Sequence, residues 1–220
     1  MYSFSFYSLF LILSFVFSNN KGLATVRGIY VNQQSIHSTK KLNFLIKMAK
    51  STMINTFVVD LHRMTDAYEK NISLLKEANI GMYTRIIVFP GGGNEQQIHS
   101  REYIKKRIEL AQQAARLGSK VIQLDYIRYS TKRKKSPDNA KDILSVIQQF
   151  KEAESISQLP LHIAFFGEAL YSASTAIGQD IPFFQLLSME LHLCFILHIS
   201  NLIKKVHTKH IAPFTIHSQL

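Results

Sequence analysis

Apolar runs of strand length alternate with helical stripes along most of the chain. Between the runs, apolar residues recur every three or four positions, as in Leu42–Ala49, which predicts an amphipathic helix that Ser38 can cap. Gly81 and Gly118 follow two such stripes, where a helix is expected to end. The runs are rich in β-branched and aromatic residues, which is typical of buried strands, and they cover residues 24–31, 54–61, 82–89, 120–126 and 161–166.

This alternation predicts an α/β fold with a parallel sheet covered by helices. A doubly wound sheet and a (β/α)8 TIM-barrel-like fold both fit it. The nucleotide-binding form of the doubly wound sheet lacks its main support, because no Gly-x-Gly-x-x-Gly follows the first run and the glycines at 91–93 lack a phosphate-loop lysine. About five β/α units reach residue 185, and a closed barrel needs three more of roughly 30 residues each. Only about 35 residues remain, so we expect an incomplete barrel.

The N-terminal segment, residues 1–20, reads as a signal peptide or an N-terminal anchor. Its run Tyr7–Phe17 is apolar but short for a bilayer span, and polar residues 19–21 follow Ser18. Against a signal peptide, no Lys or Arg precedes the run. We expect a periplasmic or secreted protein that meets membrane only through this segment. An uncleaved membrane anchor and a buried strand or helix are the alternatives.

Residues 24–185 form the expected barrel domain, and residues 186–220 differ from it in kind. This tail contains Cys194 and no glycine, and it lacks the strand–turn–helix punctuation found upstream. Periodicity alone does not decide whether its apolar stretch, residues 193–199, is a strand or a helix. A frameshifted or substituted C-terminus would produce such a change, so we expect the barrel pattern to stop near Gln185.

The chain is basic, with 26 Lys and Arg against 15 Asp and Glu and a net charge of +11. Such an excess suits nucleic acid, anionic lipid or an anionic polymer, and export makes nucleic acid the poorer ligand. The run at residues 131–135 contributes much of it and, without interleaved aromatics, reads first as a solvated loop. A single cysteine excludes an intrachain disulfide, and the nine histidines show no metal-ligand spacing. We therefore expect no metal and no cofactor.

Carboxylates stand at the ends of the predicted strands, where parallel α/β folds bind ligands. Asp60 and Asp125 close two strands, and Glu168 follows a third. Paired carboxylates are what cleavage of a glycosidic bond requires, one to stabilise or attack the sugar carbon and one to protonate the leaving oxygen. Neighbouring tyrosines and phenylalanines would suit stacking on sugar rings. The plainer alternative is that each aspartate is a helix cap or a loop anchor.

Several of these segments occur in an order that resembles a bacterial family of glycosyl hydrolase domains of uncharacterised activity. They are VRGIYVN, INTFVVDL, YTRIIVF, AARLGSKVIQLDYIRY and FGEALYSASTAIGQDI, which together span about residues 24–184. The most specific is LGSKVIQLDYIRY, which is similar to the family's helix end and following strand. The resemblance implies a TIM barrel related to the alpha-amylase-like enzymes and a polysaccharide or oligosaccharide substrate.

By this resemblance, Asp125 falls where amylase-like barrels have their nucleophile, and the chain has Gln123 where those enzymes commonly carry an arginine. Arg128 could pair with Asp125 and keep it ionised, or it could equally bind an anionic group of the substrate. The family's acid is expected near Ala164, so Glu168 is the nearest substitute in this chain. From their places at or near the predicted strand ends, we expect five residues to contact substrate: Tyr30, Asp60, Gln123, Tyr126 and Arg128.

Three functions therefore remain open from sequence. The chain is a glycoside hydrolase acting on O-glycosidic bonds of a polysaccharide, a shortened and inactive remnant of one, or a non-catalytic binder of anionic glycan or nucleic acid through its basic surface. An open five-stranded fragment would expose two unpaired sheet edges, which favours a remnant that is inactive or self-associating. The sequence does not indicate an oligomeric state.

Overall fold

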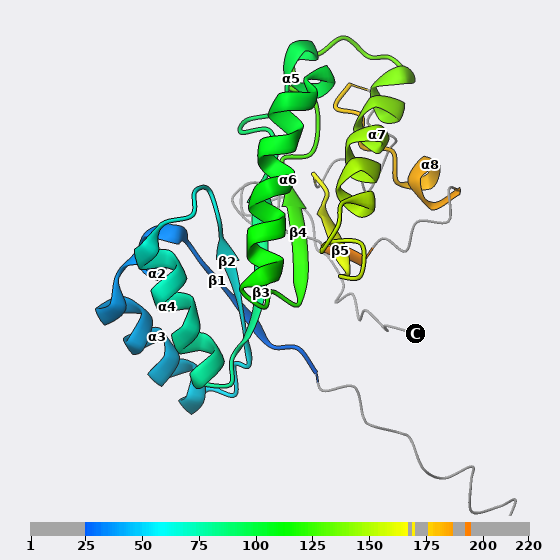
Figure 1. Cartoon of the computed structure of the whole chain (residues 1–220). Coiled ribbons are helices and arrows are strands. Elements are labelled where there is room, and N and C mark those ends of the chain that lie inside the picture. The colour runs from blue at the N-terminus through cyan, green and yellow to red at the C-terminus, as the bar shows by residue number, and fades with distance from the viewer. Residues whose placement is uncertain (1–24, 167–168, 170–175, 187–191, 195–220) are drawn as a thin grey trace, which may run out of the picture.

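The computed structural model describes residues 25–166, 169, 176–186 and 192–194 (Figure 1). Segment 1–20 and most of 186–220 therefore lie outside the described residues, and so does Glu168. The strands are β1 (Gly28–Val31), β2 (Thr56–Asp60), β3 (Gly81–Ile87), β4 (Val121–Asp125), β5 (Leu161–Ala164) and β6 (His192–Cys194). The helices are α2 (Gln33–His37), α3 (Thr39–Ser51), α4 (Asp66–Glu77), α5 (Glu95–His99), α6 (Arg101–Arg116), α7 (Asp138–Glu152) and α8 (Ile181–Leu186).

The strands form one parallel sheet in the order β1-β2-β3-β4-β5-β6. A doubly wound sheet would reverse its strand order at a switch point, and the described strands show no reversal. Right-handed connections between sequential parallel strands place their helices on one face, and Figure 1 shows the helices gathered there. This winding is compatible with part of a (β/α) barrel, and β1 and β6 are the two edges of the described sheet.

The sixth strand is a difference from the expectation of about five strand–helix units. β6 lies within the segment expected outside the barrel pattern, and it pairs in parallel with β5, Ile163 opposite Leu193. β6 therefore includes the first two residues of the run, 193–199, that periodicity left undecided. β6 pairs with the edge of β5 and is not joined to it by a tight turn. Glycine and turn signals in the sequence therefore did not reveal it.

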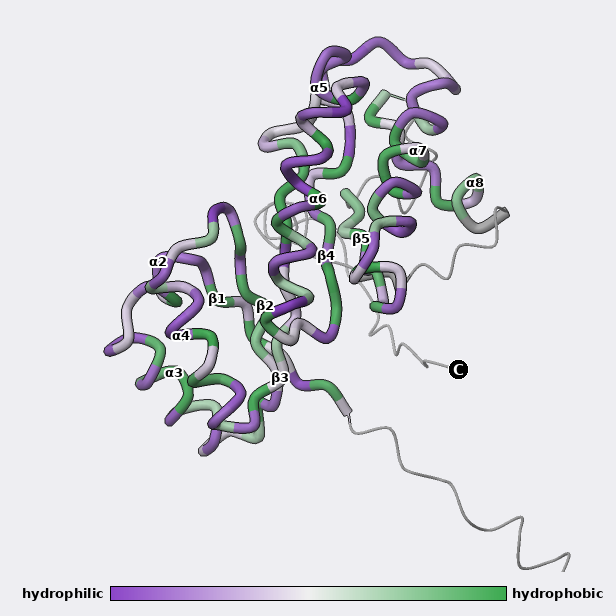
Figure 2. The backbone as a smooth tube through the Cα atoms, viewed as in Figure 1, coloured by the Kyte–Doolittle hydropathy of each residue, from purple (hydrophilic) through white to green (hydrophobic). Residues whose placement is uncertain are grey.

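The two faces of the sheet differ in chemistry. The helix-facing positions of β2, β3 and β4 are apolar apart from Thr84, and they are almost fully buried: Phe57, Val59, Met82, Thr84, Ile86, Ile122 and Leu124. On β3 these buried residues alternate with half-buried ones, as expected for side chains that point to opposite faces. The opposite face carries Tyr30, Asp60, Arg85, Gln123 and Asp125 in matching registers. Figure 2 shows the apolar strands in green behind more polar helices.

Local chemistry explains most helix ends. Ser38 caps α3 as predicted, because its side chain accepts a hydrogen bond from the backbone of Lys41. Gly118 follows α6 with φ of 91°, a left-handed conformation that glycine adopts at low cost. The prediction for Gly81 is wrong: Asn79, with φ of 57°, takes the left-handed position after α4, and Gly81 is the first residue of β3. Asparagine is the commonest non-glycine residue in that conformation.

The glycine-rich loop after β3 packs against the segment that follows β4. The backbone of Gly93 donates to the carbonyl of Arg128 at 2.8 Å and accepts from the backbone of Ser130 at 3.0 Å. A Cβ on Gly92 would lie 2.7 Å from both Arg128 Nη1 and the Tyr129 carbonyl, whereas a Cβ on Gly91 would meet nothing within 4 Å. The loop therefore serves close packing of two strand ends.

We expect Gly92→Ala to destabilise the fold by about 3 kcal/mol or more, because it combines left-handed backbone strain with a steric clash. Gly91→Ala is the matched control, since φ is positive at both positions and only Gly92 lacks space. It should cost about 1–2 kcal/mol. Urea unfolding followed by far-ultraviolet circular dichroism measures both. Equal losses would contradict the close packing described for Gly92.

Candidate functional site

Three charged residues from adjacent strands meet at the carboxyl edge of the sheet. Asp60 is the last residue of β2, Asp125 is the last residue of β4, and Arg85 lies between them on β3. The register aligns Arg85 with Asp60 on one side and with Gln123 on the other. Side chains two residues apart on a strand share a face, so Gln123 and Asp125 project to the same side as Arg85.

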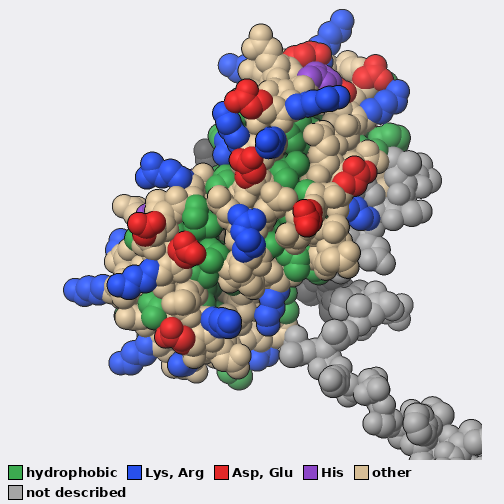
Figure 3. Space-filling view, in the orientation of Figure 1, with side chains coloured by type: hydrophobic (Ala, Val, Ile, Leu, Met, Phe, Trp, Pro, Cys, Tyr) green, Lys and Arg blue, Asp and Glu red, His purple; other side chains and the backbone are tan. Residues whose placement is uncertain are grey.

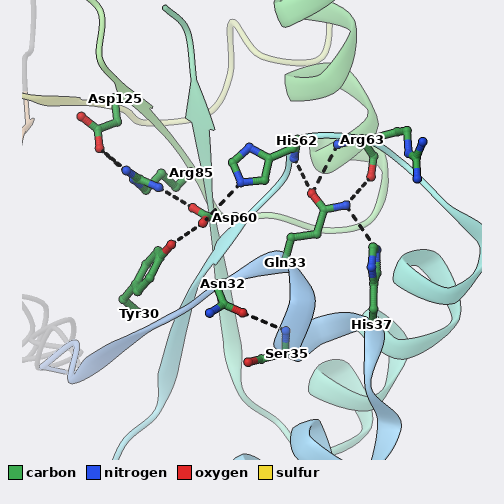
Figure 4. Close-up of polar contacts among 10 residues, drawn as sticks. All are labelled: Tyr30, Asn32, Gln33, Ser35, His37, Asp60, His62, Arg63, Arg85 and Asp125. Carbon is green, nitrogen blue, oxygen red and sulfur yellow. Dashed lines mark hydrogen bonds and ion pairs between the residues drawn. The ribbon is translucent and has the colours of Figure 1, made fainter. Parts of the chain in front are cut away.

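Arg85 forms ion pairs with both aspartates. Its Nη1 donates to Asp60 Oδ1 at 2.6 Å, and its Nε and Nη2 donate to Asp125 Oδ2 at 2.8 and 2.5 Å (Figure 4). The three side chains are well shielded, with 13% of Arg85, 4% of Asp60 and 16% of Asp125 exposed. Shielded carboxylates require a cation or several donors, and the guanidinium fork satisfies both at once.

Further bonds fix the two carboxylates. Asp60 Oδ2 accepts a hydrogen bond from the Tyr30 hydroxyl and lies 3.6 Å from Nε2 of His62. Asp125 Oδ1 accepts from the backbone of Tyr126 at 2.6 Å. Tyr126 adopts a left-handed conformation with φ of 52°, unusual for a bulky residue, and this turn directs its N–H back to Asp125.

Gln33 at the start of α2 holds the loop after β2. Its Oε1 accepts from the backbone of His62 at 2.5 Å, and its Nε2 donates to the Arg63 carbonyl at 2.7 Å (Figure 4). Asn32 precedes it and caps α2, accepting from the backbone of Ser35 at 2.8 Å. The β1–α2 connection therefore positions the end of β2, and with it Asp60.

The electrostatic surroundings shift the pKa of two residues in the cluster. Burial and the hydrogen bond to Asp60 raise the pKa of Tyr30 to about 12. Desolvation lowers the pKa of Arg85, but its bonds and charge interactions with Asp60 and Asp125 outweigh that effect, so its pKa is raised. Arg85 is consequently a permanent cation, and Tyr30 remains a hydrogen-bond donor far above neutral pH.

Arg128 does not form the ion pair with Asp125 that was one of its two expected roles. The recorded ion-pair partner of Asp125 is Arg85, and Arg128 Nη1 instead donates to the Tyr129 carbonyl at 2.9 Å. Its guanidinium carbon lies 4.6 Å from the ring centroid of Phe166 and 5.3 Å from that of Tyr126. Desolvation lowers the pKa of Arg128, which fits a cation held by aromatic rings and a carbonyl.

Arg85 is the residue that sequence reasoning missed. Resemblance to amylase-like barrels led us to expect an arginine at the position of Gln123, and the register places Arg85 directly beside Gln123 on the neighbouring strand. The available signal was a lone charge within the otherwise apolar run of residues 82–89. Only the strand register shows that this charge lies between two aspartates.

Two aromatic side chains at this edge are exposed. Tyr30 is 56% exposed although its hydroxyl is fixed by Asp60, and Phe166 is 45% exposed although its ring packs on Arg128. The buried Gln179 also holds Phe166, because its Oε1 accepts from the Phe166 backbone at 2.8 Å. Exposed rings held in fixed orientations suit stacking on a flat or weakly polar ligand face.

The basic run belongs to the loop between β4 and α7, at the same edge of the sheet. Arg133 pairs with Glu95 and lies 4.7 Å from the ring centroid of Tyr129, so one of its cations has a structural role. Figure 3 shows basic and acidic side chains interspersed over the helical face. That face therefore carries no broad single-sign patch of the kind that nucleic-acid binding requires.

Among the described residues, neither a metal cluster nor a pocket offers a better candidate site than the strand ends. In the part of the chain that the structure describes, no three His, Cys, Asp or Glu side chains gather to hold a metal ion, and no helix there is long and apolar enough to cross a bilayer. A surface hollow of about 410 Å³ contains none of the strand-end residues; it is lined by Ile98, His99, Arg101, Ile104, Asp142, Ser145 and Gln149.

We expect Tyr30 to titrate at about pH 12, measured as the tyrosinate absorbance lost in Tyr30→Phe. The raised pKa means that the folded state retains this proton longer than the unfolded state. Its stabilising effect is present below about pH 10 and is lost as pH rises towards 12. Asp60→Asn should move the titration back towards 10, because it removes the adjacent charge. A Tyr30 titration near 10 in the unmodified protein would contradict the contact.

Three solved structures share part of their backbone arrangement with this chain. A hypothetical protein from Ruminiclostridium thermocellum ATCC 27405 aligns with 61% of this chain and 96% of its own length, at 17% identity and a TM-score of 0.49. The glycoside hydrolase domain of PelA from Pseudomonas aeruginosa aligns over 70% and 64%, at 12% identity and a TM-score of 0.41. The Bacillus cereus spore cortex-lytic enzyme SleL aligns over 64% and 36%, at 12% identity and a TM-score of 0.43. The chain thus spans less than two thirds of the PelA domain, and no protein-family model or curated protein matches it.

Proposed function

We propose that the strand-end site is of the glycoside hydrolase type and acts on O-glycosidic bonds of a polysaccharide. The observation that carries this proposal is the Asp125 carboxyl, held by Arg85 and by the Tyr126 backbone at the carboxyl edge of a sequentially wound parallel sheet. A retaining glycosidase needs one carboxylate held in a fixed position as its nucleophile, and the donors of Arg85 hold Asp125 in this way. The resemblance of the segment around Asp125 to glycosyl hydrolase domains supports the same assignment.

Each residue has a distinct role in this proposal. Asp125 attacks or stabilises the developing oxocarbenium carbon, and Arg85 holds its carboxyl group in position. Asp60 and Tyr30 form a polar wall beside it, with the Tyr30 ring available to stack on a sugar. Glu168 is the proposed proton donor to the leaving oxygen, because Asp60 and Asp125 are both paired with Arg85 and therefore unsuited to that task. Residues 1–20 are proposed to direct export to the periplasm or outside the cell, where such a polymer would be met.

The pairing of both aspartates also favours a second candidate, which is glycan binding without hydrolysis. Hydrolysis needs a protonated carboxyl within reach of the leaving oxygen, and each of the two described carboxylates at this edge is bonded to a cation. Fixed aromatic rings and bonded carboxylates suffice for recognition of a sugar. The two candidates therefore differ in turnover and share the same binding surface.

We expect Asp125→Asn to reduce the release of reducing sugar from a responsive polysaccharide by about 10³-fold or more, because the amide cannot act as the nucleophile. Asp138→Asn is the matched control: Asp138 is an exposed aspartate on α7 that pairs only with Lys141 among the described residues. Its activity should equal that of the unmodified chain. A broad glycan panel with binding but no turnover would reject hydrolysis and support the second candidate.

Phe166→Ala should weaken glycan binding about tenfold, because it removes a fixed stacking surface and loosens Arg128. Phe44→Ala is the control, since Phe44 is an even more exposed phenylalanine on α3, away from the strand ends. Affinity electrophoresis through gels containing the polysaccharide measures both variants. Equal retardation of the two would show that the Phe166 ring does not contact the glycan.

A further inference from the structure

The outer face of α3 is unusual for a helix at the surface of a soluble domain. Phe44 is 62% exposed and Met48 is 44% exposed, and their spacing of four residues places them on one side of the helix. The opposite side buries Leu42, Ile46 and Ala49 in the core. The helix is therefore apolar on the core side and again at the centre of its solvent side, where polar residues are normally found.

The exposed apolar surface continues beyond the end of α3. Met53 is 71% exposed and has φ of 58°, a left-handed conformation that is strained for a bulky side chain. Its carbonyl accepts a hydrogen bond from Nε of Arg27 at 2.8 Å, which brings the start of the described chain beside it. Val26, next to Arg27, is 52% exposed. We call Val26, Phe44, Met48 and Met53 the α3 apolar face.

Cations surround this face and acids are absent from its part of the chain. Lys40, Lys41, Lys47 and Lys50 are all exposed on α3. The sequence contains no aspartate or glutamate before Asp60. Long lysine side chains beside exposed aromatic and aliphatic groups are typical of helices that lie in a lipid–water interface. The lysines favour an anionic partner. The apolar side chains between them favour a partner that also offers hydrocarbon.

We propose that the α3 apolar face and its lysines dock on an anionic lipid bilayer. Figure 1 places α3 at the outer edge of the helical layer, where a planar surface can reach it. The chain that precedes Thr25 carries the apolar run Tyr7–Phe17, and it enters the described structure at Thr25, which is hydrogen-bonded through its carbonyl to Asn55, close to Met53. A segment with affinity for the membrane would therefore join the fold at the corner where the α3 apolar face ends.

Fluorescence of Phe44→Trp in the full chain tests this docking, because the sequence contains no tryptophan and the new indole is the sole reporter. Vesicles of phosphatidylglycerol and phosphatidylcholine should shift the emission of F44W to the blue, and brominated lipid should quench it. Phosphatidylcholine alone should leave the emission as in buffer. Phe166→Trp, at an exposed position on the carboxyl edge, should respond to neither.

Lysine substitutions in the F44W background test the charge. Lys40→Gln with Lys47→Gln should lower the partition coefficient about 25-fold, at roughly fivefold per lysine near an anionic surface. Lys105→Gln with Lys151→Gln removes the same charge from exposed positions on α6 and α7 and should leave the coefficient nearly unchanged.

Three outcomes would overturn the proposal. F44W emission could stay as in buffer while the chain floats with anionic vesicles, which would assign membrane binding to another segment. The emission could shift with protein concentration in the absence of lipid, which would mean that a second copy covers the face. If the two lysine pairs lowered the partition coefficient equally, binding would depend on the overall charge of the protein and not on α3.

Discussion

The candidate site depends on a single buried cation between two carboxylates. Asp60 and Asp125 end strands that flank β3, so each is held in place by the sheet rather than by a mobile loop. Without Arg85, two shielded negative charges would face each other with few donors, a situation that costs several kcal/mol. Lysine could not substitute, because an ammonium group lacks the planar fork that binds Asp60 through one nitrogen and Asp125 through two.

A second arginine at the same edge is stabilised in a different way. Arg128 donates to a backbone carbonyl and packs against two aromatic rings, and burial lowers its pKa. Its contribution is therefore packing: it supports Phe166 and fills the space that Gly92 leaves open. Arg85 pairs with the two carboxylates, whereas Arg128 packs against the rings around them. Gln179 completes this framework, because its Oε1 accepts a hydrogen bond from the Phe166 backbone and its Nε2 donates to the Ile127 carbonyl.

Sequence periodicity predicted the parallel α/β arrangement because buried strands and amphipathic helices each leave a local signature. It also placed Asp60 and Asp125 at strand ends, since each follows a run of buried residues directly. Arg85 was missed because its meaning is non-local: alternation along β3 shows which face it is on, but only pairing with β2 and β4 shows its partners. Arg128, close in sequence to Asp125, was the natural but wrong choice, because the left-handed turn at Tyr126 alters the direction of the chain.

Other differences have the same origin. Gly81 follows a helical stripe and was expected to end it, but Asn79 adopts the left-handed conformation two residues earlier. β6 carries no turn signal because its pairing with β5 is provided by a sheet edge that forms far away in sequence. In both cases the local sequence pattern was insufficient, because contacts distant in sequence determined the structure.

The two proposed surfaces fit one orientation of the molecule. The polar site lies at the carboxyl ends of the strands, whereas Val26 and Met53 flank the amino ends of β1 and β2. A bilayer that meets α3 and this corner therefore leaves the carboxyl edge directed away from the lipid. Tyr30 and Phe166 would then face the aqueous side, where a long polymer can lie across the edge of the sheet without contacting lipid headgroups.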